Sequence, residues 1–319
     1  MQELQKLQDI QQPSAKILAV ALTPDGSLCA AGDRDGFIHI IDVKSGAVLR
    51  KLRQQHIEFV YTLAIHPQTG HLFSAGKDKS IREWNIDTGE CIKDYAGIFS
   101  PGSAHSAGRG LKAATKSHKM TILSIALERD GLMATGSQDT TLKLWKNDDP
   151  VRTFDWHTGP VTCVRFQPGT RVLFSASRDK TIRSWNEITG ALIHKYTGHL
   201  GEIIALEFID ADHFASADVL GNVMLWNAES EHFDHILYKS PERLFCAKCI
   251  PSRDALLLGK ENGAIEAISL IPHEANATPQ AICAATEHAC EIRCIDATPS
   301  GIIASGDNSG KVVLWNFSH

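Results

Sequence analysis

A pattern of apolar and polar residues recurs along this chain. In five places an apolar run is followed by a short polar turn and then by alternating apolar and polar residues; one example is GLMATGSQDTTLKLWK (131–146). Alternation with a period of two is typical of β-strands that bury one face. Each of these segments therefore predicts a β-hairpin. The tryptophans at which they end are Trp84, Trp145, Trp185, Trp226 and Trp315.

Two further segments, 27–42 and 255–270, keep the pattern but carry Ile41 and Ile268 in place of tryptophan. The steps between the seven anchor residues are 43, 61, 40, 41, 42 and 47 residues. A period near 42 with about four short strands per unit is typical of a β-propeller. The prediction is one all-β domain over 1–319 with seven blades. The blade boundaries expected from the repeat are 13–55, 56–95, 118–156, 157–198, 199–239, 240–287 and 288–319 plus 3–10, with an insertion over 96–117.

The last blade contains only three strands before the sequence ends. The segment ELQKLQDI (3–10) is similar to the outer-strand segment 47–55 and is predicted to supply the fourth strand. A missing outer strand would leave a sheet edge exposed, which favours this closure. The alternative is a short helix, because Leu4, Leu7 and Ile10 recur every three residues.

The repeats resemble WD40 repeats, and the resemblance extends from about Lys16 to Trp315. It rests on a histidine four residues before the first strand's apolar anchor and on an aspartate six residues before the tryptophan. The resemblance implies a hydrogen-bonded tetrad of His, Ser or Thr, Asp and Trp within a blade. Three blades match it fully, with His56, Ser74, Asp78 and Trp84; His118, Thr135, Asp139 and Trp145; and His157, Ser175, Asp179 and Trp185.

The other four blades depart from the tetrad pattern. The fifth has His199, Ser216 and Trp226 but Leu220 at the aspartate position, and the seventh has His288, Ser305 and Trp315 with Ser309 there. The first and sixth blades lack the tetrad and are expected to rely on apolar packing alone. Their residues at the matching positions are Pro13, Ala31 and Ile41, and Ser240, Leu258 and Ile268.

Composition and charge narrow the classes of function. The formal net charge is −5, which disfavours nucleic acid and anionic membranes as partners. No apolar run approaches the ~20 residues that span a bilayer. The N-terminal sequence shows no signal peptide, so we expect a cytoplasmic or nuclear protein with its eight cysteines reduced.

The sequence offers little catalytic or metal-binding chemistry. Histidines that cluster with serine and aspartate belong to the tetrads, whereas a catalytic triad needs an accessible nucleophile and base. Cys246 and Cys249 lie in a predicted strand at a spacing that places them on opposite faces. A zinc site from His288, Cys290, Cys294 and Cys283 is conceivable, but the histidine falls at the tetrad position. We therefore expect no enzyme, no metal, no cofactor and no small-molecule substrate.

A surface for partners is the remaining candidate. The resemblance implies that peptides bind beside the start of each first strand and at the turn before the tetrad aspartate. At these positions the chain carries three aromatic residues and five cations that we single out as a hypothetical site. They are Phe59, Tyr61, Phe245, Arg34, Lys77, Arg178, Arg243 and Arg293. Aromatic residues and arginine are enriched in binding hot spots. The alternative is that these side chains only pack the mouth of the channel.

The insertion 96–117 is a second candidate. It is rich in Gly, Ser and Ala, and between Tyr95 and Leu127 it carries no acidic residue. Its basic residues include Arg109, Lys112 and Lys116, which could gather an acidic or phosphorylated partner. A tolerated surface insertion without function is an equal alternative.

Together these observations predict a non-catalytic scaffold that binds proteins or peptides, with an acidic partner favoured. The alternative is a substrate-receptor or adaptor subunit of a larger assembly, such as a ubiquitin ligase or an RNA-processing complex. Many receptor propellers of this family carry Trp-Asp-x-Arg, whereas here Asn or Lys follows the tryptophans.

Overall fold

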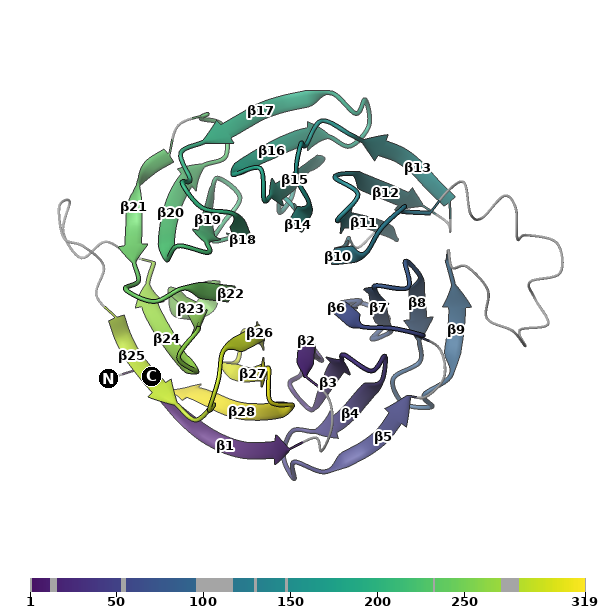
Figure 1. Ribbon diagram of the computed structural model, residues 1–319, viewed down its shortest axis with the longest axis vertical. Helices are drawn as coiled ribbons and strands as arrows, with labels where there is room; N and C mark the ends of the chain where they lie inside the picture. Colours follow the sequence, from purple (N-terminus) through teal and green to yellow (C-terminus); the bar gives the residue numbers. More distant parts are fainter. Residues whose placement is uncertain are drawn as a thin grey trace, which may run out of the picture.

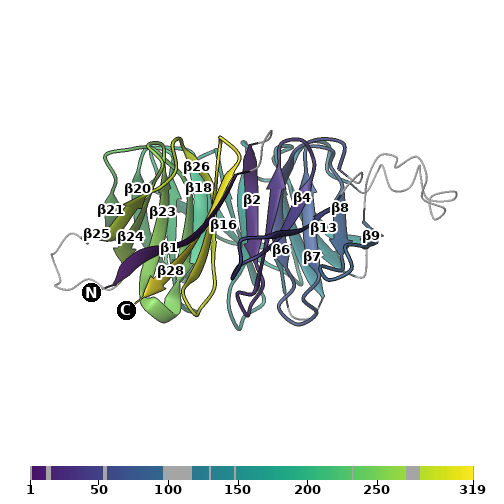
Figure 2. The ribbon, with the colours of Figure 1, turned by 90° about the horizontal axis from the view of Figure 1, so that it is seen from below.

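The computed structural model describes residues 2–11, 16–52, 56–95, 117–128, 131–146, 149–231, 233–270 and 281–318, with the backbone alone at 233 and 234. Seven four-stranded antiparallel sheets surround a central opening (Figure 1). The innermost strands run along the axis of a short disc (Figure 2). The predicted all-β, seven-bladed fold is confirmed.

Each of the first six blades consists of four consecutive strands, numbered here from the inside outwards. Blade 1 has β2 (Ile17–Leu22), β3 (Leu28–Asp33), β4 (Ile38–Asp42) and β5 (Val48–Leu52). Blade 2 has β6 (Val60–Ile65), β7 (Leu72–Gly76), β8 (Ile81–Trp84) and β9 (Cys91–Asp94). Blade 3 has β10 (Ile122–Leu127), β11 (Leu132–Ser137), β12 (Leu142–Lys146) and β13 (Asp149–Phe154).

The second half of the ring repeats this arrangement. Blade 4 has β14 (Val161–Phe166), β15 (Val172–Ser177), β16 (Thr181–Asn186) and β17 (Leu192–Thr197). Blade 5 has β18 (Ile203–Phe208), β19 (His213–Asp218), β20 (Asn222–Asn227) and β21 (Phe233–Lys239). Blade 6 has β22 (Leu244–Ile250), β23 (Ala255–Lys260), β24 (Ala264–Ser269) and β25 (Ala281–Thr286), with a 3-10 turn at Pro251–Arg253.

Blade 7 joins the two ends of the chain. Strands β26 (Ile292–Ala297), β27 (Ile302–Asp307) and β28 (Lys311–Ser318) are completed by β1 (Glu3–Gln11), which pairs antiparallel with β28. The N-terminal segment is therefore the predicted closing strand and not a helix.

A β-bulge explains how β1 uses its three apolar residues. The pairing shifts between Lys6 and Gln8, so Leu7 is the extra residue and is 40% exposed. Leu4 lies opposite Phe317 and Ile10 lies opposite Val312. Because 317 and 312 are an odd number of residues apart, the bulge turns Leu4 and Ile10 toward opposite faces of the sheet.

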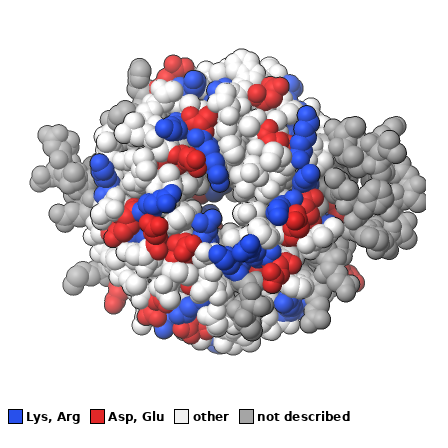
Figure 3. All heavy atoms as spheres, viewed as in Figure 1, with Lys and Arg blue, Asp and Glu red and all other residues white. Residues whose placement is uncertain are grey.

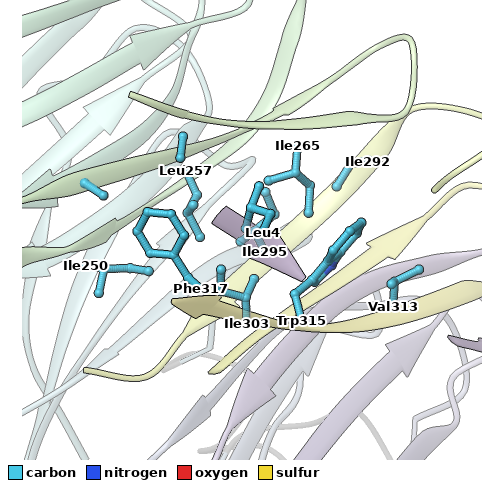
Figure 4. Close-up of a cluster of buried hydrophobic side chains, with 12 residues drawn as sticks. Leu4, Ile250, Leu257, Ile265, Ile292, Ile295, Ile303, Val313, Trp315 and Phe317 are labelled. Carbon is cyan, nitrogen blue, oxygen red and sulfur yellow. The ribbon is translucent and has the colours of Figure 1, made fainter. Parts of the chain in front are cut away.

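The two faces of blade 7 bury different clusters. Leu4 packs with Trp315 and Phe317 against Leu257 and Ile265 of blade 6 (Figure 4). On the other face, residues of β1 and β28 pack against blade 1. The closing strand thus stabilises the contacts of blade 7 with both of its neighbours, and similar apolar clusters lie between other adjacent blades.

Candidate functional site

Buried tetrads hold the turns between the second and third strands. In blade 2 the His56 Nε2 atom lies 2.7 Å from Ser74 Oγ, and Trp84 Nε1 donates to the same hydroxyl at 2.8 Å. Asp78 lies 3.0 Å from His56 Nδ1. Asp78 also accepts from Arg82 Nη1 at 3.0 Å, so a buried cation joins the tetrad of this blade.

The same bonds recur in two further blades. His118 lies 2.8 Å from Thr135 and 3.1 Å from Asp139. In blade 4 the three distances around the tetrad are 2.8 Å, 2.8 Å and 2.9 Å, for His157 to Ser175, His157 to Asp179, and Trp185 to Ser175. Trp145 donates to Thr135 at 2.8 Å. The tetrad histidines are buried, so these groups are placed to fix turns and not to meet a substrate.

Blades 5 and 7 form tetrads as well, which corrects the expectation for their aspartate position. The acceptor is not at 220 or 309 but two residues earlier. Asp218 lies 2.9 Å from His199 Nδ1, and Asp307 lies 2.7 Å from His288 Nδ1. Each carboxylate stands at the end of the second strand, from where it reaches both the histidine and the backbone N–H groups of the turn.

Blades 1 and 6 do not rely on apolar packing alone, which is a second correction. In blade 1 a buried hydrogen bond joins Asp33 Oδ2 and His39 Nε2, which lie 2.9 Å apart. In blade 6 an ion pair of Lys260 and Glu266, 2.7 Å apart, occupies the equivalent positions, with the lysine where blade 1 has its aspartate. A buried polar pair thus joins the second and third strands in each of these two blades, at positions that the tetrad pattern does not include.

These turns form one end of the propeller, which we call the turn face. In every blade a turn residue donates its backbone N–H to the carbonyl that precedes the innermost strand, at 2.8–3.3 Å. The donors are Arg34, Lys77, Gln138, Arg178, Val219, Glu261 and Asn308, and the acceptors are Lys16, Phe59, Thr121, Pro160, Glu202, Arg243 and Glu291. The two sets of positions proposed from the sequence therefore meet at the same end of each blade.

One aromatic cluster lies where blades 1 and 2 meet. The guanidinium carbon of Arg34 is 4.9 Å from the ring centre of Phe59, and Lys77 Nζ is 4.7 Å from it. Tyr61 lies beside Phe59, with 5.8 Å between the ring centres. Lys77 also pairs with Glu58 at 3.0 Å. We call Arg34, Phe59, Tyr61 and Lys77 the Phe59 cluster.

A second cluster lies where blades 6 and 7 meet. Arg293 is 4.8 Å and Arg243 is 5.9 Å from the ring centre of Phe245. We call these three residues the Phe245 cluster. No carboxylate of a described residue forms an ion pair with either arginine or with Arg34. Three guanidinium groups that lie over phenylalanine rings are therefore available to a ligand.

The remaining predicted site residues are less available. Arg178 pairs with Glu202 at 3.5 Å, and both side chains are about half exposed. Arg109, Lys112 and Lys116 lie outside the described residues. Both basic and acidic side chains lie around the central opening (Figure 3). The two Phe clusters are thus the best-defined part of the proposed site.

The zinc site considered from the sequence would use His288, Cys290, Cys294 and Cys283. Among the described residues there is no group of three or more His, Cys, Asp or Glu side chains that could hold an ion. Both ring nitrogens of His288 bond within the tetrad, and all eight cysteines are free thiols. Burial raises the pKa of Cys246 and of Cys249 to about 12, so both stay protonated.

The fold defines a β-propeller with a tetrad in five of its seven blades. The family model described as WD domain, G-beta repeat, matches residues 4–42, 46–85, 111–146 and 148–186. The chain belongs to the WD40-repeat proteins. In the ranges that the structure describes, no helix has the length and apolar character needed to cross a membrane.

Comparison with known proteins extends the likeness beyond these four segments. The chain is 25% identical over 304 residues to a U3 snoRNP-associated protein-like EMB2271 of Arabidopsis thaliana, covering 88% of this chain and 61% of that protein. It is 25% identical to transcription initiation factor TFIID subunit 5 of Caenorhabditis elegans, covering 53% and 23%. It is 29% identical to nuclear distribution protein nudF 1 of Talaromyces marneffei, covering 46% and 29%. The chain thus spans less than two thirds of the length of these relatives.

Proposed function

We propose that this propeller is a non-catalytic scaffold that binds acidic peptides or proteins on its turn face. The observation that carries the proposal is the pair of clusters in which two cations lie over one phenylalanine ring. The rings of Phe59 and Phe245 are partly exposed beside arginines without a described acidic partner. The names of two relatives, one snoRNP-associated and one a TFIID subunit, support a role as a component of an assembly.

Stacking explains why these positions suit a carboxylate. A guanidinium group that lies on an aromatic ring is already oriented, so less side-chain entropy is lost when it binds. Its planar N–H edge can form two parallel hydrogen bonds with one carboxylate. Each cluster also carries two cations, which attract acidic partners although the chain as a whole has a net charge of −5.

The test uses a fluorescein-labelled peptide rich in Asp and Glu, with a peptide in which Lys and Arg replace these acids as the control. We expect the acidic peptide to bind more tightly and its affinity to fall as salt is raised. The double variant Arg34→Glu, Arg243→Glu should weaken binding by at least about tenfold. Lys195→Glu on the outer strand β17 is the matched control, since Lys195 is equally exposed and lies away from the turn face.

Equal binding of both peptides, or a double variant that binds like the Lys195 control, would refute the proposal. The aromatic residues are tested by Phe59→Ala, Tyr61→Ala, Phe245→Ala in one protein. This triple variant should lose partners in affinity purification from lysate. Because the three side chains are only partly buried, its melting temperature should stay close to wild type. A large drop in melting temperature would assign these residues to the core.

A further inference from the structure

The central channel contains a cavity that the proposed function does not use. Its volume is about 710 Å³, within the range of small-molecule sites. It lies toward the ends of the innermost strands, and Pro168 and Gly169 on its rim are exposed. The turn-face residues are not part of its lining.

One residue per blade forms a ring in this cavity. The position four residues after the first strand's apolar anchor carries alanine in blades 1, 2 and 3 and a charged residue in blades 4 to 7. The charges alternate in sign around the ring: Arg165, Glu207, Lys248 and Asp296. We call these four residues the channel quartet.

The rest of the lining is largely apolar. Leu63, Ile65 and Leu127 of blades 2 and 3 lie on the side of the ring that carries the alanines, and each is partly exposed. The cavity thus has an apolar half and a charged half. A ligand that fits both halves needs an apolar body and a polar head.

The quartet is paired internally but keeps free bonding capacity. Arg165 Nη2 donates to Glu207 Oε1, and Lys248 Nζ lies 3.0 Å from Asp296 Oδ1. The second carboxylate oxygen of Asp296 accepts from the Leu22 N–H at 2.8 Å. Lys248 has three N–H donors and Glu207 has a second oxygen, so an ammonium and a carboxylate on neighbouring strands can each take a further partner. The side chain of Lys248 is 28% exposed.

The charge balance selects the polar head. The quartet has no net charge, and Glu128 adds one acidic group to the lining. A lone anion would therefore meet a slightly negative cavity, and a lone cation would lie beside Arg165 and Lys248. A head with both charges can place its carboxylate at Lys248 and its ammonium at Glu207 without adding net charge.

We infer that this cavity binds a small zwitterion with an apolar body, of the kind represented by an apolar α-amino acid. The apolar half of the channel takes the body, and the facing charges of Glu207 and Lys248 take the head. This site is separate from the turn face, so either could fail without affecting the other.

Four probes that share one body test the head. They are L-tryptophan, N-acetyl-L-tryptophan, L-tryptophan amide and N-acetyl-L-tryptophan amide, which are zwitterionic, anionic, cationic and neutral. Isothermal titration calorimetry of the whole chain should show one site for L-tryptophan, with each derivative at least about tenfold weaker, since each lacks one or both charge-assisted bonds. Equal affinities for the four probes, or no binding of L-tryptophan, would overturn the inference.

Variants locate the site. Ala64→Leu narrows the cavity away from the quartet and should weaken binding of L-tryptophan, whereas Phe245→Ala at the turn face should leave it unchanged. Glu207→Gln removes the partner of the ammonium and one negative charge, so the preference for L-tryptophan over its N-acetyl form should fall toward one. This ratio compares two ligands on the same protein, so it does not depend on a change in stability. The inference would be refuted if Ala64→Leu bound L-tryptophan as tightly as wild type, or if Glu207→Gln kept the wild-type preference for L-tryptophan over its N-acetyl form.

Discussion

Replacing Asp218 by alanine tests which residue completes the tetrad of blade 5. Its carboxylate accepts from His199 Nδ1 at 2.9 Å and from the Gly201 N–H at 3.2 Å, and both donors are buried. It also accepts from the N–H groups of Leu220 and Asn222, at 2.9 and 3.1 Å. The latter two lie in a turn that water can reach.

The two buried donors determine the magnitude. A buried donor that loses its acceptor costs about 1–3 kcal/mol, so Asp218→Ala should lower the free energy of unfolding by about 2–6 kcal/mol. Leu220→Ala at the position expected from the repeat is the control. The Leu220 side chain is 52% exposed, and its truncation should change stability by less than about 0.5 kcal/mol.

The assay is unfolding in guanidinium chloride followed by tryptophan fluorescence, with circular dichroism as a second probe. A third variant, Asp218→Gly with Leu220→Asp, copies Gly76 and Asp78 of blade 2 and should recover part of the loss. The turns match, since Lys79 and Gly221 hold corresponding positive φ angles of 65° and 93°. Equal stabilities of the Asp218→Ala and Leu220→Ala proteins would refute the reasoning.

Three further predictions concern stability. Trp145→Ala should lower the free energy of unfolding by about 3–5 kcal/mol in the same assay, because the ring is buried and its N–H donates to the tetrad. A loss below about 1 kcal/mol would contradict this prediction. Lys260→Met should lower the free energy of unfolding by about 3–5 kcal/mol because it leaves Glu266 buried without its cation. Adding Glu266→Leu should restore most of this loss. A double variant no more stable than Lys260→Met would show that the unpaired Glu266 does not cause the loss. The third prediction is acid sensitivity at Asp307. Burial raises the pKa of this carboxyl, but the hydrogen bond from His288 and those from the turn outweigh it and lower the pKa to about 2. Its stabilisation of about 2 kcal/mol is therefore complete above the usual pKa near 4 and is lost as pH falls toward 2, and a pH titration of stability should show this part missing in Asp307→Asn.

The propeller itself could be predicted from the sequence because its information is local. Each blade repeats one alternation pattern, one polar turn and one buried tryptophan within about 40 residues. The closing strand could be predicted for a similar reason, since a three-stranded last blade needs a fourth strand. Which face of the sheet each apolar residue of this strand occupies could not be predicted, because the bulge at Leu7 becomes visible only when β1 is paired with β28.

The tetrad corrections show where pattern matching fails. A carboxylate at 218 or at 220 can reach the same histidine, since both positions belong to one turn. The pattern of the three complete blades predicted the carboxylate at position 220, whereas in the structure Asp218 forms the hydrogen bond with His199. The Lys260–Glu266 pair was not predicted, because its residue types differ from those of the tetrad and lie at other positions of the repeat.

The sequence by itself determined the seven-bladed ring, its tetrad-bearing blades and the aromatic and basic residue types at one end. The tertiary structure decided which of these residues meet. Arg34 lies over the ring of Phe59 from the neighbouring blade, and the channel quartet is assembled from four separate blades. Arg34 and Phe59 are 25 residues apart, and successive members of the quartet are 41 to 48 residues apart. They meet because the ring places successive blades side by side. The fold is thus determined by local periodicity, whereas the clusters depend on ring closure.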